Sequence, residues 1–135
     1  MANILSSGLA DKLFIDHLVL VISDIGRTRV FYSKIFGEPA YQNERSVVYN
    51  IGRTRLFLVL PHGELPSGDV FSPNRIGLEH FAIGIGSVEE LSEVGRVLDA
   101  GGIVHSGIHI DKHSKREKIW LDDPDKIRIE FFIYA

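Results

Sequence analysis

Two short stretches of this chain repeat one unusual pattern. IDHLVLVI at residues 15–22 and LEHFAIGI at 78–85 are apolar runs in which an acid and then a histidine stand near the start. Each run is followed by a segment with helical spacing and then by three short β-rich runs. The sequence therefore predicts a βαβββ unit that occurs twice. A unit of about 60 residues buries little apolar surface alone, so the two units must share a core or pair with a second chain.

Capping and turn residues set the boundaries of the units. Asp24 or Ser23 is expected to begin the first helix, which runs to about Phe36, and Ser87 with Glu90 forms a capping box for the second. The expected later strands are 39–44, 46–51 and 54–60 in the first unit, and 103–106, 116–121 and 127–134 in the second. The prediction is one domain, with module one at about 13–60, a linker rich in proline and glycine at about 61–76, and module two at about 77–134.

Composition excludes several classes of function. The net charge is −3 and the basic residues are scattered, so no basic stripe is available for nucleic acid. The chain has no cysteine, which excludes disulfides and thiolate metal sites. No secretory signal is visible, and no apolar run reaches the ~20 residues that span a bilayer. We expect a soluble cytoplasmic protein with no nucleic-acid or membrane partner.

Strand alternation places the two histidines on equivalent faces. His17 shares its face with Val19 and Val21, and the bulkier residues of that strand point the other way, toward the expected helix. His80 likewise lies on the slimmer face of its strand. In the last strand Glu130 lies on the corresponding face, where Arg128 could pair with it. All three ionisable side chains are therefore expected on the concave side of the sheet.

Two imidazoles and one carboxylate are a recognised ligand set for a metal ion. Arranged on one side of the metal, they form a facial triad that leaves coordination positions open for water or substrate. A closed structural site would use four protein ligands. His17, His80 and Glu130 therefore predict a catalytic divalent transition-metal site for iron, manganese, nickel or zinc.

Three segments together carry a resemblance to a known family. They are DHLVLVISDIGRTRVFYSKIFG at 16–37, EHFAIGIGSVEEL at 79–91 and WLDDPDKIRIEFF at 120–132. In these segments the chain resembles the vicinal oxygen chelate superfamily, which includes glyoxalase I, extradiol dioxygenases, fosfomycin-resistance enzymes and bleomycin-resistance proteins. The resemblance implies an α+β fold in which the paired βαβββ modules form a cupped, mostly antiparallel eight-stranded sheet with helices outside. It assigns the metal ligands to His17, His80 and Glu130. RTRLFLVL at 53–60 offers no fourth ligand of the glyoxalase I kind.

The resemblance also suggests residues around the metal. His113 lies in the loop that borders the site in relatives, and an imidazole there could act as a general acid or base. Ring-cleaving relatives usually have a tyrosine where Trp120 stands, so complete ring-cleavage chemistry is not implied. The expected substrate-binding residues are Trp120, Lys118, Arg128, Arg55, Tyr49 and Phe57.

Two classes of function are consistent with these features. The first is a metalloenzyme whose small substrate chelates the metal through neighbouring oxygens, with isomerisation, lyase chemistry, epoxide opening and oxygenation all open. The second is a non-catalytic protein that binds an antibiotic or aromatic ligand, as bleomycin-resistance proteins do. Relatives of this length are commonly homodimers in which two chains share each site, so His17 is expected to meet His80 and Glu130 of its neighbour.

Overall fold

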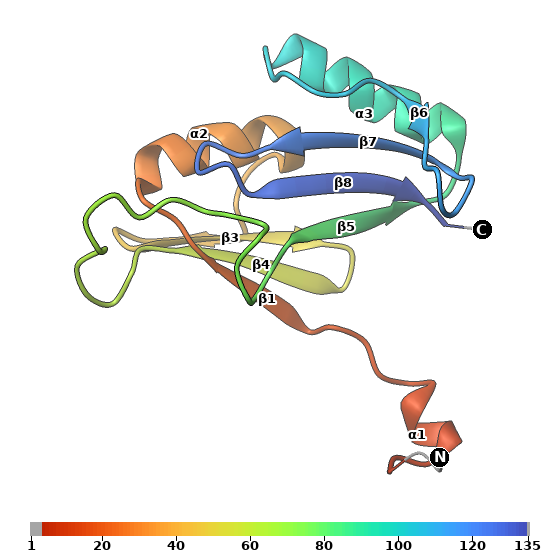
Figure 1. Cartoon of the computed structure of the whole chain (residues 1–135), viewed down its shortest axis with the longest axis horizontal. Helices are drawn as coiled ribbons and strands as arrows, with labels where there is room; N and C mark the ends of the chain where they lie inside the picture. Colours follow the sequence, from red (N-terminus) through yellow and green to blue (C-terminus); the bar gives the residue numbers. More distant parts are fainter. Residues whose placement is uncertain (1–3, 135) are drawn as a thin grey trace.

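The computed structural model describes residues 4–134 and is an α+β fold (Figure 1). Two modules follow a short N-terminal helix, α1 (Ser7–Ala10). Module one contains β1 (His17–Val21), α2 (Ile25–Phe36), β2 (Tyr41–Gln42), β3 (Ser46–Ile51) and β4 (Thr54–Val59). Module two contains β5 (His80–Ile85), α3 (Val88–Ala100), β6 (His109–Ile110), β7 (Glu117–Asp122) and β8 (Arg128–Ile133). The predicted pair of βαβββ units is confirmed.

The helix boundaries follow from capping residues. The Asp24 side chain accepts a hydrogen bond from the Arg27 amide at 2.8 Å, so Asp24 rather than Ser23 begins α2. Gly37 ends this helix with a φ of 79°, which a residue with a Cβ adopts at a cost. Ser87 accepts from the Glu90 amide at 3.1 Å and begins α3, as the capping box predicts.

The eight strands form two four-stranded sheets, with strand orders β1-β4-β3-β2 and β5-β8-β7-β6. In each sheet the first strand of the module pairs in parallel with the last, and the other pairs are antiparallel. The expectation of one continuous eight-stranded sheet is not met within this chain. β1 and β5, which would have to join the two sheets, each have a free edge in the described part of the chain.

One predicted strand is wrong in position. Residues 103–106 do not form a strand, and the pairing with β7 is made instead by His109–Ile110. Two local features explain the shift. Gly107 has a φ of 70°, which interrupts an extended chain, and the His105 ring is held 2.7 Å from Asp99 at the end of α3. Ile103 is buried in the core without belonging to a sheet.

The core lies between the helices and the bulky faces of the strands. Leu20 of β1 and Ile22 directly after it are buried, whereas Val19 and Val21 on the face of His17 are half exposed. This is the predicted alternation. α2 packs against α3, and residues of both modules join one apolar cluster, in which the rings of Phe36 and Phe131 lie 6.5 Å apart. Each module thus buries surface that it would expose alone.

A turn of module two is bound by the first helix of module one. The buried Tyr32 hydroxyl donates to Oδ2 of Asp123 at 2.8 Å, and the other Asp123 oxygen accepts from the amides of Asp125 and Ile127 at 2.8 and 2.9 Å. Burial and the nearby Asp123 charge raise the pKa of Tyr32, so this hydroxyl stays protonated as a donor. Ser23 also hydrogen-bonds Asp125. The aspartates of this turn therefore fasten the two modules together.

The described residues before β1 extend away from the two modules (Figure 1). They include α1, in which no residue is buried. Among the described residues, no helix has both the length and the apolar character needed to cross a membrane.

Candidate metal centre

The two histidines occupy identical positions in the two modules. His17 is the first residue of β1 and His80 the first residue of β5. In each case the acid immediately before the histidine holds its Nδ1: Asp16 Oδ2 lies 2.8 Å from His17, and Glu79 Oε1 lies 2.7 Å from His80. A carboxylate on Nδ1 fixes the tautomer with the proton on that nitrogen and leaves the Nε2 lone pair free. Both side chains are thus prepared to bind a metal through Nε2.

Glu130 faces His80 across two neighbouring strands. β5 and β8 pair in parallel with Ala82 opposite Glu130, and Oε2 of Glu130 lies 3.6 Å from Nε2 of His80. The Glu130 side chain is 8% exposed and that of His80 is 35% exposed. One oxygen and one nitrogen of the kind that bind transition metals therefore point toward each other at the surface of module two.

The charge of Glu130 is balanced by a lysine. Nζ of Lys118 lies 3.1 Å from Oε1 of Glu130 and 3.2 Å from Oδ1 of Asp111. Burial opposes protonation of Lys118, but the hydrogen bonds and charges of the two carboxylates outweigh it and raise the pKa of Lys118. Hydrogen bonds from the Ser114 amide and side chain lower the pKa of Asp111. The three groups form an ionised Asp111–Lys118–Glu130 cluster.

Arg128 forms no ion pair with Glu130, so the pairing that the sequence left open is not made. Its guanidinium binds Asp122, with Nε 2.9 Å from Oδ1, and stacks 3.8 Å above the Trp120 ring. Lys118 reaches Glu130 from the neighbouring strand β7. The sequence spacing within β8 does not show how β7 is aligned with it, so this pair could not be predicted. Trp120 and Arg128 lie side by side on the face of Glu130, with the guanidinium charge balanced by Asp122.

His17 lies apart from this pair, on the sheet of module one. Its ring is 5.5 Å from the ring of Phe57, and Arg55 is its register partner on β4. Within residues 4–134 of a single chain, no group of three potential ligands among His, Cys, Asp and Glu gathers around one point. One chain therefore presents two of the expected ligands together and the third separately.

The register of the two modules explains why the ligand set is asymmetric. Glu130 stands opposite Ala82 in module two, and the matching position in module one, opposite Val19, is occupied by Phe57. A phenyl ring offers no ligand atom. The sequence analysis found no fourth ligand in residues 53–60, and the register places Phe57 at the position where one would stand.

Tyr49 is not a substrate-binding residue in this structure. It is 1% exposed, and its hydroxyl lies 2.8 Å from the Ser33 hydroxyl of α2. Its register partner is Leu56, a core residue, so Tyr49 lies on the helix side of the sheet. The sequence-based prediction was one residue out of register, which reverses the face of a strand residue.

His113 is exposed in the turn before β7, where its backbone amide donates to Asp111 at 3.1 Å. No contact of its ring with the other site residues is seen in the structure. Its role as a general acid or base stays a prediction.

Sequence reasoning missed the residues that support the site. Asp16 and Glu79 were visible as an acid before each histidine, and this repeated dipeptide was a usable signal. Asp111 lies in a loop with no repeated counterpart, and only the fold brings it to Lys118.

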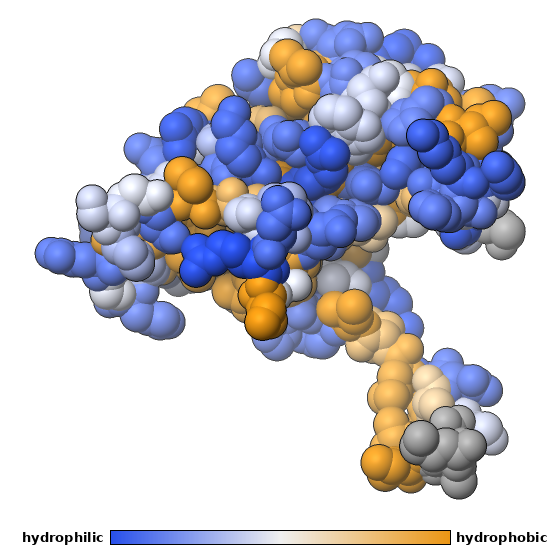
Figure 2. All heavy atoms as spheres, viewed as in Figure 1, coloured by the Kyte–Doolittle hydropathy of each residue, from blue (hydrophilic) through white to orange (hydrophobic). Residues whose placement is uncertain are grey.

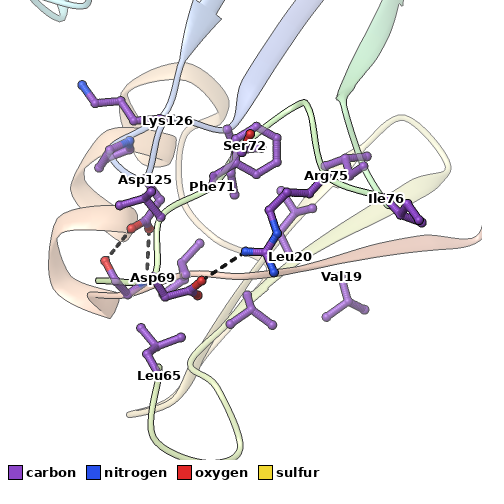
Figure 3. A pocket seen from close by; sticks show the side chains of 17 residues that line it. Val19, Leu20, Leu65, Asp69, Phe71, Ser72, Arg75, Ile76, Asp125 and Lys126 are labelled. Carbon is purple, nitrogen blue, oxygen red and sulfur yellow. Dashed lines mark hydrogen bonds and ion pairs between the residues drawn. The ribbon is translucent and has the colours of Figure 1, made fainter. Parts of the chain in front are cut away.

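A cavity lies beside β1 (Figure 3). It has a volume of about 630 Å³ and lies between β1, the linker and the turn after β7. Apolar side chains of the linker, including Leu65, Phe71 and Ile76, line it together with Val19, and an ion pair between Arg75 and Asp69 at 3.5 Å crosses its wall. None of the three predicted ligands lines this cavity. It nonetheless continues the face on which His17 lies, because Val19 and His17 share that face.

Replacing Lys118 tests whether it balances Glu130. We expect Lys118→Met to lower the free energy of unfolding by about 2 kcal/mol, because it leaves a mostly buried carboxylate without its cation. The double variant Lys118→Met/Glu130→Gln should recover most of this loss, since the uncompensated charge is then gone. Urea unfolding of metal-free protein measures both. Additive losses in the double variant would contradict the pairing.

Two βαβββ modules that each begin with a histidine-bearing strand, with a carboxylate on the last strand, define a class of small α+β proteins. The chain belongs to the Glyoxalase/Bleomycin resistance protein/Dioxygenase superfamily, whose family model matches residues 14–131. Members of this superfamily are commonly metal-dependent enzymes.

Solved structures share this fold at low sequence identity. A glyoxalase candidate from Bacillus halodurans has a TM-score of 0.77 and 20% identity, with 93% of this chain and 99% of that chain covered. A glyoxylase/bleomycin resistance protein/dioxygenase domain from Frankia sp. EAN1pec has a TM-score of 0.74 and 17% identity, covering 91% and 93%. Lactoylglutathione lyase from Agrobacterium tumefaciens has a TM-score of 0.68 and 19% identity, covering 90% and 93%. No curated protein matches the sequence.

Proposed function

We propose that this protein is a metal-dependent enzyme of the glyoxalase and dioxygenase type. It acts on a small substrate that presents two neighbouring oxygens to a divalent transition metal. The metal is held by His80 and Glu130 of one chain and by His17 of a second chain. The homodimer therefore has two sites, related by a twofold axis.

The observation that carries this proposal is that both histidines are oriented by a carboxylate in the same way. Each has its Nδ1 bound by the preceding carboxylate, at 2.8 Å for His17 and 2.7 Å for His80, and each keeps Nε2 free. Such carboxylate–histidine pairs are the usual outer shell of metal-binding imidazoles. The 3.6 Å approach of His80 and Glu130 supplies two ligand atoms at one place.

The surface of the chain supports a second copy. Residues of this chain expose 9226 Å², whereas a compact monomer of 15.1 kDa exposes about 7,100 Å². The difference of about 2,100 Å² per chain corresponds to about 4,200 Å² for two chains, which lies within the range that obligate dimers bury. The free edges of β1 and β5 are natural places for this contact, because an unpaired edge leaves backbone hydrogen-bonding groups open.

A bound metal would act as a Lewis acid on the substrate oxygens and lower the pKa of bound water. The residues of the chain have separate tasks. Lys118 engages one oxygen of Glu130 and leaves the other, Oε2, facing His80. Trp120 and the stacked Arg128 provide a surface that suits a planar or anionic part of the substrate. Arg55 and Phe57, beside His17, provide the same kinds of contact from the other module.

Elemental analysis of the protein purified without chelator tests the proposal. We expect close to one equivalent of a transition metal per chain after reconstitution. Iron with oxygen uptake on a catechol would support oxygenation, whereas nickel, zinc or manganese would favour isomerase, lyase or epoxide-opening chemistry. Less than about a tenth of an equivalent after reconstitution would contradict a metal site.

A second function is favoured by one specific observation. Lys118 already neutralises Glu130, so this carboxylate is stable without a metal. The alternative is therefore a non-catalytic protein that holds an aromatic or antibiotic ligand, using the apolar cavity of about 630 Å³ beside β1. Ligand binding by calorimetry that is unchanged by EDTA, in protein without metal, would favour this alternative.

A further inference from the structure

Residues 4–15, before β1, expose apolar side chains that no other described residue covers. This arm, residues 4–15, is orange over much of its length in Figure 2 and projects from the body. Its exposed large apolar residues are Ile4, Leu5, Leu9, Leu13, Phe14 and Ile15. Isolated apolar residues on a surface are ordinary, but a contiguous apolar segment standing away from the fold indicates a surface for a partner.

The end of the arm next to β1 is held by contacts with its own chain, and these contacts determine which side chains point outward. Phe14 lies under the guanidinium of Arg53 at 4.0 Å, and the Thr54 hydroxyl donates to the Ile15 carbonyl at 2.7 Å. The neighbours of Phe14 in sequence, Leu13 and Ile15, are 57% and 67% exposed. The arm therefore holds to its own chain through Phe14 and presents Leu13 and Ile15 outward.

The positions of the two histidines indicate which part of a second chain the arm would contact. His17 and His80 are the first residues of β1 and β5. If His17 binds the same metal as His80 of a second chain, the N-terminal ends of these two strands meet. We take the two repeated modules that share a site to be related by a twofold rotation, and the two strands then leave the meeting point in opposite directions. The chain that reaches His17 from upstream must therefore approach it along the second chain's β5.

We propose that the arm of each chain packs along β5 of a second copy, close to the shared site, with Leu9, Leu13 and Ile15 as its contacts. This inference rests on the proposed shared site and deepens it, because it names the surface that brings His17 to the partner.

β5 is suited to receive such a segment. It pairs only with β8 in the described residues, so its other edge is free for an incoming extended chain. The exposed face carries the small residues Ala82 and Gly84, which leave space beside the strand. A Cβ at Gly84 would meet only the Tyr134 ring, at an ordinary 3.5 Å, so this position tolerates a probe side chain.

The absence of cysteine from the chain permits a direct test. A tagged chain with Leu13→Cys is mixed with an untagged chain with Gly84→Cys and treated with a short bis-maleimide. We expect a cross-linked heterodimer as the main product. The control replaces the first variant by Glu44→Cys, an exposed position on the turn before β3, and should give little heterodimer. Light scattering and metal content are measured on the same mixtures.

The outcomes separate the two proposals. A metal-binding dimer without the Leu13–Gly84 cross-link, or with equal cross-linking of the Glu44 control, would overturn the arm placement and leave the shared site intact. A monomer without metal would overturn the shared site, and the arm placement with it.

A second variant checks the contribution of the arm without any cross-linker. Leu9→Ser/Leu13→Ser/Ile15→Ser should weaken dimerisation at least about 100-fold in sedimentation, because three apolar side chains lose their burial. Asp11→Ser/Lys12→Ser in the same segment should leave it unchanged. Since all five positions are exposed in the single chain, each variant should retain its fold by circular dichroism. Equal dimerisation of the two variants would overturn the arm contact.

Discussion

Mixing the His17→Ala and His80→Ala variants should restore about a quarter of the wild-type metal content, although neither variant binds metal alone. Each homodimer lacks one ligand in both of its sites. In a heterodimer the intact His17 of one chain meets the intact His80 and Glu130 of the other. One of its two sites is then complete, and half of the dimers are heterodimers after random exchange.

A matched pair of variants provides the control for this experiment. His80 and Glu130 come from the same chain, where their side chains lie 3.6 Å apart. A mixture of His80→Ala and Glu130→Gln therefore leaves every site damaged and should bind no metal. Metal content by elemental analysis and exchange by mass spectrometry measure both mixtures. Failure of the first mixture, with exchange demonstrated, would show that the ligands are not shared between chains.

Asp123→Ala is expected to have the largest effect on stability, lowering the free energy of unfolding by about 3–5 kcal/mol. The Asp123 side chain is almost completely buried and accepts hydrogen bonds from Tyr32, Asp125 and Ile127. Alanine leaves three donors without an acceptor. Asp122→Ala, at the end of β7, removes only a partly exposed pair with Arg128 and should cost less than about 1 kcal/mol. Equal losses in the two variants would contradict the role of Asp123 as the fastening residue.

The Asp123→Asn variant separates hydrogen bonding from charge. Burial raises the pKa of Asp123, so the folded chain holds its proton more tightly than the unfolded chain does. The stability from this proton is present below the unfolded pKa of about 3.9 and is lost as the pH rises through the folded pKa. Asparagine does not titrate. The advantage of the wild type over Asp123→Asn should therefore shrink between pH 3 and pH 7 in urea unfolding.

The repeat in the sequence was enough to predict the two modules. An apolar run with an early acid and histidine, followed by a capped helix, occurs twice, and alternation correctly placed Val19 and Val21 opposite the core face. The same reasoning failed for Tyr49, because the register of β3 against β4 is set by a hairpin and by packing under α2. It also failed for the strand expected at 103–106, where Gly107 and the contact of His105 with Asp99 decide the backbone.

The sequence by itself determined the two long helices, their capping residues and the face on which each histidine lies, because these depend on neighbours three or four residues away at most. Only the tertiary structure decided which charge balances Glu130, since Lys118 and Asp111 reach it from a different strand and a loop. The tertiary structure also separated His17 from His80 and Glu130 in the single chain. The modules pack through their helices, which buries the bulky faces and leaves β1 and β5 with free edges and the histidines on open surfaces.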